Sequence, residues 1–371
     1  MRGWVVIAFL LIAACSGEQT AKPAYHATDN PERLSEWGMS GVSDGALRLA
    51  EGVTPYDLAT PLFSDYALKL RTVWIPESQA ATYDESEAFD FPVGTVFTKT
   101  FYYKQEGAAW TGAVLQAEGP VLSYNALPLE GVRLIETRVL VHRENGWAAL
   151  PYVWNEDQTD AYLKRTGDVQ RLTLVRTDGR AEEFAYLVPD ANQCAACHAT
   201  NATTRAIKPI GPKARHLNKP STFVHGVNQL EDWMTAGLLT GDVGNAAAVP
   251  QNAVWTDETA TIERRARAYL DANCAHCHNP NGAADTSGLN LEPDAQGPAM
   301  GFCKSPIAAG GGSGGRPFDI VPGAPDQSIT VFRLQTTDPG AMMPELGRAV
   351  SHEEGVALIA EWIAQMDGNC G

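Results

Sequence analysis

The chain has 371 residues, of which 44% are hydrophobic, and its 44 acidic and 28 basic side chains give a formal net charge of −16. The hydrophobic content is sufficient for real cores, and the length corresponds to two or three domains. The negative charge makes nucleic acid and anionic lipid poor partners. A solvated acidic surface is the simplest interpretation, and attraction toward a basic partner protein is the more specific alternative.

Residues 1–14 have the pattern of an export signal. Arg2 precedes a short apolar run that ends in small residues before Cys15. The run is too short for a transmembrane helix, which needs about 20 residues. The end of this segment resembles the lipobox of bacterial lipoproteins. The resemblance implies a signal peptide, lipidation of Cys15 and, with Ser16 next to it, a periplasmic lipoprotein anchored in the outer membrane. Residues 15–33 are polar and are predicted to form a tether.

Residues 34–189 are predicted to form a β-rich domain, either a sandwich or an open barrel. β-branched and aromatic runs alternate here with glycine turns, as strands and hairpins require. The clearest runs are residues 91–103, 133–141 and 170–176. Four aromatic residues could line a ligand cleft, although a place in the core is the commoner role. They are Trp110, Trp147, Tyr152 and Trp154.

The pattern Cys-x-x-Cys-His occurs twice, at residues 194–198 and 274–278, and it is the attachment signature of c-type haem. On a helical turn these three side chains share one face, so that one haem can bind both thiols as thioethers and the imidazole through its iron. A redox disulfide or half of a zinc site is the alternative, but structural zinc sites place histidine farther from the cysteines. We therefore expect two covalently attached haem c groups. The thioether residues would be Cys194, Cys197, Cys274 and Cys277, and the proximal iron ligands His198 and His278.

Residues 190–255 are expected to form the first haem domain. After the motif, Ile210-Gly211-Pro212 resembles the Gly-Pro of small cytochromes, where a carbonyl can hold the second nitrogen of the proximal imidazole. His216 follows too closely and would lie nearer the proximal face. His225, in a loop before a helix expected over residues 228–239, is the better distal candidate, and Met234 is the third. The iron could also be five-coordinate.

Residues 256–371 are expected to form the second haem domain. Thr256-Asp257-Glu258 could cap a helix that runs into Cys274, and Ser351-His352-Glu353-Glu354 has the form of a capping box before an apolar helical face. A helix, a haem motif, a loop-rich middle and a C-terminal helix match the plan of class I cytochromes c. Met343, directly before proline, resembles the distal methionine of that class, with Met342 as its rival. A methionine that fills a core gap is the alternative.

Two cysteines remain, Cys303 and Cys370. In an oxidising periplasm two spare thiols are expected to form a disulfide, and two buried free thiols are the alternative.

Taken together, the chain resembles a family of exported bacterial dihaem c-type cytochromes over most of its mature length. The likeness lies in residues 60–66, 91–95, 192–198, 273–280 and 343–348. The resemblance implies an α+β multidomain fold, with the β-rich N-terminal domain followed by two mainly α cytochrome c-type haem domains. It also implies electron transfer without a settled substrate.

Two functions therefore remain open. The first is a lipid-anchored periplasmic electron carrier that passes single electrons between redox partner proteins, with the membrane reached only through the lipid. The second is a haem enzyme, such as a peroxidase or a small-molecule oxidoreductase, with an open first haem. No catalytic residue is assigned from the sequence. The sixth ligand of the first haem distinguishes the two functions.

Overall fold

The computed structural model describes residues 22–117, 123, 125–307 and 309–371. The export signal and Cys15 lie outside the described residues. Strand residues outnumber helical ones, 27% against 21%. Among the described residues, no helix has both the length and the apolar character needed to cross a membrane.

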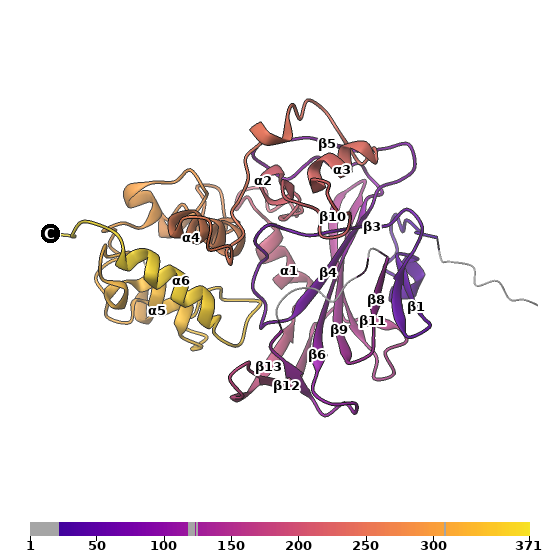
Figure 1. Ribbon diagram of the computed structural model, residues 1–371, viewed down its shortest axis with the longest axis horizontal. Coiled ribbons are helices and arrows are strands. Elements are labelled where there is room, and N and C mark those ends of the chain that lie inside the picture. Colours follow the sequence, from indigo (N-terminus) through magenta and orange to yellow (C-terminus); the bar gives the residue numbers. More distant parts are fainter. Residues whose placement is uncertain (1–21, 118–122, 124, 308) are drawn as a thin grey trace, which may run out of the picture.

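A large curled sheet of nine strands forms the body of the molecule (Figure 1). Its main path runs β11-β10-β9-β6-β7-β12-β13. Off this path, β4 pairs with β6, and β3 pairs with β4. The strands are β3 (Thr54–Tyr56), β4 (Leu68–Trp74), β6 (Val96–Gln105), β7 (Ala113–Leu115), β9 (Val132–Arg143), β10 (Gly146–Trp154), β11 (Ala161–Leu163), β12 (Asp168–Val175) and β13 (Ala181–Val188). Two small sheets accompany it. One contains β1 (Ser40–Ser43), β2 (Ala46–Leu49) and β8 (Ala126–Pro128), and the other contains β5 (Ala81–Thr82) and β14 (Leu239–Thr240).

The central strands are covered on both faces. In β9, Val139 and Val141 belong to one hydrophobic core, while Leu140 between them belongs to another. Successive side chains of a strand point to opposite faces, so β9 separates two cores. This explains why Val139, Leu140 and Val141 are consecutive apolar residues, which burial of one face alone would not require.

Residues 190–255 do not form a separate, mainly α domain. They contain the short helices α1 (Ala191–His198), α2 (Ala214–Leu217) and α3 (Gln229–Thr235). Leu217 of α2 and Trp233 of α3 are buried in the same core as Phe97 of β6. The segment therefore depends on the sheet for its burial and is an extension of the β-rich part.

A C-terminal lobe follows with a separate core. It contains α4 (Ile262–Leu270), α5 (Ile329–Gln335) and α6 (Glu353–Ala364), which lie together beside the sheet in Figure 1. A π-helical turn, η3 (Asp271–Ala275), continues α4 into the second motif. The remainder of the lobe is loops and short 3-10 turns. The turns are η4 (Asp285–Ser287), η5 (Gly297–Met300), η6 (Gly310–Ser313) and η7 (Pro325–Gln327).

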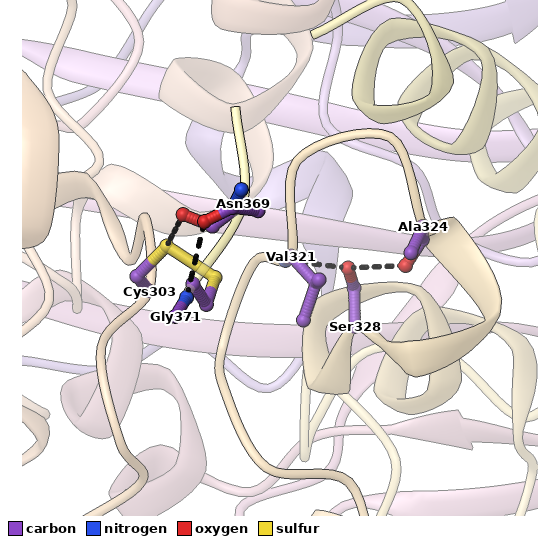
Figure 2. Close-up of a disulfide and its surroundings, with 7 residues drawn as sticks. Cys303, Val321, Ala324, Ser328, Asn369 and Gly371 are labelled. Atoms are coloured by element: carbon purple, nitrogen blue, oxygen red, sulfur yellow. Dashed lines mark hydrogen bonds between the residues drawn. A yellow bond between two sulfur atoms is a disulfide. The ribbon is translucent and has the colours of Figure 1, made fainter. Parts of the chain in front are cut away.

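A disulfide joins Cys303 to Cys370 and so ties the end of the chain to the middle of this lobe (Figure 2). The two Cα atoms are 5.1 Å apart, with 67 residues of sequence separation. Nearby, the Ser328 hydroxyl accepts from the Val321 amide and donates to the Ala324 carbonyl, which holds the turn before α5.

The expected fold class was wrong. The protein is mainly β, with one large curled sheet and about six α-helices, and not a β domain with two mainly α cytochrome domains. The helices of residues 190–255 are too short to bury a core among themselves, so they pack on the sheet instead. The expected helix caps were also misplaced: α4 begins after Thr261, whose hydroxyl accepts from the Arg264 amide, and α6 begins after His352.

Candidate functional site: two Cys-x-x-Cys-His motifs beside one cavity

The first motif lies on α1, which packs against β10. Asp190 caps this helix, because its carboxylate accepts from the Gln193 amide while the Gln193 side chain accepts from the Asp190 amide. This capping box fixes the start of an eight-residue helix. Cys194, Cys197 and His198 therefore follow on one helical turn, at the spacing that one haem requires.

His198 is held in the form that a proximal ligand needs. Its Nδ1 lies 2.8 Å from the Lys208 carbonyl oxygen, and a carbonyl only accepts, so Nδ1 carries the proton and Nε2 keeps its lone pair. Burial lowers the pKa of His198 to about 4, so the imidazole is neutral at pH 7. The carbonyl belongs to Lys208, two residues before the Ile210-Gly211-Pro212 segment that was expected to support the proximal side.

His278 of the second motif is held in the same way by a hydroxyl. Its Nδ1 lies 3.1 Å from Ser287 Oγ, and that hydroxyl donates its own proton to the Ala284 carbonyl. Ser287 must therefore accept from Nδ1, which again leaves Nε2 of the ring as the free lone pair. Burial lowers the pKa of His278 to about 4.

Met343 lies with the second motif. A small cavity of about 80 Å³ is lined by Cys274, His278 and Met343, so the structure brings together three of the residues expected at the second haem. Cofactor pockets measure about 300–1,000 Å³, so this cavity, as it stands, is smaller than a porphyrin requires. Met342 is buried at 9% exposure and does not line this cavity.

A larger cavity of about 590 Å³ lies between the sheet, α1 and the C-terminal lobe. Its volume is within the range of cofactor pockets. Cys194, Cys197 and His198 line it, and so do Ala275 and His276 of the second motif. Both motifs therefore border one space. The donor set and the volume fit a haem attached at the first motif.

Three cations form a row across the sheet wall of this cavity. Arg71 of β4 lies opposite Lys99 of β6, which lies opposite Arg138 of β9. Like charges directly opposite on neighbouring strands repel. A row of this kind in a protein of net charge −16 indicates that an anion belongs beside it.

The pairing within the row supports that interpretation. Glu136 binds Arg138 through two hydrogen bonds, and Asp57 accepts from one nitrogen of Arg71. Arg71 Nη2 is buried and has no hydrogen-bond partner among the described residues. The Lys99 ammonium lies 4.9 Å from the centroid of the Phe101 ring, and burial together with repulsion by Arg71 lowers the pKa of Lys99 well below its usual value. Haem propionates are anions that could satisfy Arg71 and Lys99.

Two further histidines line the cavity and differ in their partners. His216 is occupied at both nitrogens: Nδ1 lies 3.2 Å from Asn252 Nδ2, and Nε2 lies 3.4 Å from an Asp271 carboxylate oxygen. The Nδ1 atom of His276 is buried without a hydrogen-bond partner among the described residues. Burial lowers the pKa of both imidazoles to about 4.

The other candidates lie away from the two cavities. His225 is exposed, in the loop before α3, and does not line either of them. Met234 is 37% exposed on α3. Among the four aromatic residues, Tyr152 and Trp154 are buried in a core, Trp147 packs against another, and Trp110 is exposed.

Sequence reasoning missed the cationic row and the orientation of His276. A lysine within the otherwise apolar and threonine-rich first half of a buried strand could have indicated Lys99. His276 could have been noticed as a third possible ligand within its own motif. Within the described part of the chain, no group of three or more His, Cys, Asp or Glu side chains is arranged to hold a bare metal ion.

Comparison with family models, curated proteins and solved structures found no match to this chain.

Proposed function

We propose that this chain is a dihaem c-type cytochrome that passes single electrons between redox partner proteins. Haem c supplies one-electron iron chemistry when it is bound. The chain contributes two thiols at each motif for attachment. It also contributes His198 and His278, each with Nδ1 hydrogen-bonded and Nε2 left for iron.

The observation that carries the proposal is the convergence of the motifs on one cavity. Cys197 and His276, from motifs far apart in sequence, line the same space. The loops that follow the motifs are joined by a hydrogen bond of 2.7 Å from the Ala202 amide to the Asn281 carbonyl. Electron tunnelling weakens steeply with distance, so adjacent attachment points are the arrangement that internal electron transfer needs.

The proposed setting follows from charge and from the N-terminal segment. The formal net charge of −16 favours basic redox partners. We propose that the protein is exported, lipidated at Cys15 and anchored in the outer membrane as a periplasmic lipoprotein. The tether would place the folded part away from the bilayer.

One observation favours a second candidate, a haem enzyme with an open first site. The cavity of about 590 Å³ carries Arg71 and Lys99 on its wall, and these cations could hold a small anionic substrate instead of propionates. Such an enzyme would be a peroxidase or a small-molecule oxidoreductase.

The first test is the haem content of protein produced with a c-type maturation system. We expect two covalent haems in the unmodified chain and one after Cys194→Ala/Cys197→Ala or Cys274→Ala/Cys277→Ala. Cys303→Ser/Cys370→Ser is the control and should retain two. A mature chain without covalent haem would overturn the proposal.

Electron paramagnetic resonance then separates the two candidates. Two low-spin ferric signals, one of them lost in Met343→Ala, are expected of a carrier. A persistent high-spin signal from the first haem, together with turnover of peroxide or a small anion, would support the enzyme.

A further inference from the structure

His276 occupies an unusual place in the second motif. It lies between Cys274 and Cys277, yet it lines the large cavity with Cys194, Cys197 and His198 rather than the small cavity with Met343. The second motif therefore presents one imidazole, His278, to its own site and a second imidazole toward the site of the first motif.

The described residues around the large cavity offer few other free ligands. His198 is committed to the proximal position by its bond to the Lys208 carbonyl, and His216 is occupied at both nitrogens. No methionine is among the residues that line this cavity. His276 combines a position on the cavity wall with a buried ring nitrogen that has no partner in the described part of the chain.

The segment that carries His276 is held firmly against the rest of the protein. Asp271 receives two hydrogen bonds from Arg215 of α2, at 2.8 and 2.9 Å. Asn273 accepts from the Phe63 amide at 2.7 Å. Both contacts lie within five residues of His276, on the π-helical turn that precedes it, so the backbone that carries the ring is held in place by contacts with α2 and with the segment before β4.

We propose that His276 is the distal ligand of the iron that His198 holds, so that the second haem motif completes the first haem site. The inference rests on the proposed function, because it requires haem at the first motif. It assigns both axial positions of the first haem to histidine and makes this site depend on docking of the C-terminal lobe. It also links the two irons through one short peptide segment, since His276 and His278 are two residues apart.

The chain offers a matched substitution. Ala196 occupies the position of the first motif that corresponds to His276, so His276→Ala gives the second motif the same sequence, Cys-Ala-Ala-Cys-His, as the first. Attachment of both haems is therefore expected to survive this change.

The test compares the electron paramagnetic resonance spectrum of the oxidised dihaem protein with the spectra of His276→Ala and His225→Ala. We expect two low-spin signals in the unmodified protein and in His225→Ala. In His276→Ala we expect two covalent haems, one of them high-spin, with the low-spin signal restored by added imidazole.

Two low-spin haems in His276→Ala would overturn the inference while leaving the dihaem proposal standing. If His276→Ala loses haem, His276→Met decides the matter. Methionine ligation raises the potential of a haem relative to bis-histidine ligation, so the first haem should then be low-spin with a raised potential. An unchanged potential would overturn the inference. Fewer than two covalent haems in the unmodified chain would count against the proposed function itself.

Discussion

Arg215 and Asp271 form a bidentate ion pair that joins α2 to the turn before the second motif. Nε and Nη2 of the guanidinium lie 2.8 and 2.9 Å from the two carboxylate oxygens, and the Asp271 side chain is only 2% exposed. The Asn252 amide donates to the same carboxylate at 2.7 Å. The pair fastens the C-terminal lobe to the helices that pack on the sheet, and so sets the relative position of the two motifs.

Removing Arg215 should destabilise the protein strongly. An unpaired buried carboxylate costs about 3–5 kcal/mol, so Arg215→Ala is expected to lower the unfolding free energy by that amount in urea titrations followed by circular dichroism. Arg264→Ala is the control, because Arg264 is an exposed arginine of α4, in the lobe that the pair fastens, and it should change stability little. Equal effects of the two substitutions would contradict this role of the pair.

The same pair predicts a loss of stability in acid. Burial alone would raise the pKa of Asp271, but the hydrogen bond from Arg215 and the neighbouring positive charges outweigh it and hold the pKa at about 2. A carboxyl group whose pKa is lower in the folded state stabilises the protein at pH values above its unfolded-state pKa. This stabilisation is lost as pH falls through the folded-state pKa. The unmodified protein should lose about 2 kcal/mol between pH 5 and pH 1 that Asp271→Asn does not lose. Parallel pH profiles of unfolding free energy would contradict this.

The contribution of Asp65 to the unfolding free energy should change with pH in the opposite direction. Asp65 accepts from the amides of Ala349 and Val350 at 2.6 and 2.9 Å, but burial outweighs these bonds and raises its pKa to about 6. A carboxyl group whose pKa is higher in the folded state stabilises the protein at pH values below its unfolded-state pKa. This stabilisation is lost as pH rises through the folded-state pKa. Relative to Asp65→Asn, the unmodified protein should lose about 3 kcal/mol between pH 3 and pH 7. Urea unfolding across this range measures the difference, and a profile that rises over the same range would refute it.

The disulfide should stabilise the C-terminal lobe. Cys303 and Cys370 close a long loop, with 67 residues of sequence separation, and the chain-entropy model gives about 4 kcal/mol for such a loop. Cys370→Ser should lower the midpoint of urea unfolding, and reductant should lower it for the unmodified protein but not for the variant. A variant with an unchanged midpoint would show that the bond constrains the unfolded chain little.

Local sequence was enough to locate several elements but not to assemble them. The runs at residues 133–141 and 170–176 are confirmed as parts of β9 and β12, because β-branched residues fit a buried pleated strand. The run at 91–103 begins as a strand only at Val96, after Pro92 and Gly94. The fold class was wrong because the burial of α2 and α3 is decided by the distant Phe97 and not by their own pattern.

The candidate site divides in the same way. Each Cys-x-x-Cys-His motif is contiguous, so its residues could be named from the sequence. The row of Arg71, Lys99 and Arg138 arises only when β4, β6 and β9 pair in one register, and no local pattern specifies that register. The direction of His276 depends likewise on how the lobe docks through Asp271.

The cationic row leads to a prediction about redox potential. If Arg71 and Lys99 neutralise the propionates of the first haem, removing the Lys99 charge should favour the oxidised iron, because less positive potential remains to stabilise the added electron. A loss of about 1 kcal/mol of charge interaction corresponds to roughly 40 mV for one electron, so Lys99→Met should lower the potential of the first haem by that amount. Spectroelectrochemical titration measures both haems in one experiment.

Lys104→Met is the matched control for this titration. Lys104 is on the same strand, β6, and its substitution removes the same charge, but it does not line the large cavity. Lys104→Met should leave the reduction potential of the first haem within a few millivolts of its value in the unmodified protein, since charges near the surface are screened by salt. Equal shifts in the two variants would mean that Lys99 acts only through net charge. An unchanged potential in Lys99→Met would place the propionates elsewhere, and the row would then be free to hold a small anion, as the enzyme candidate requires.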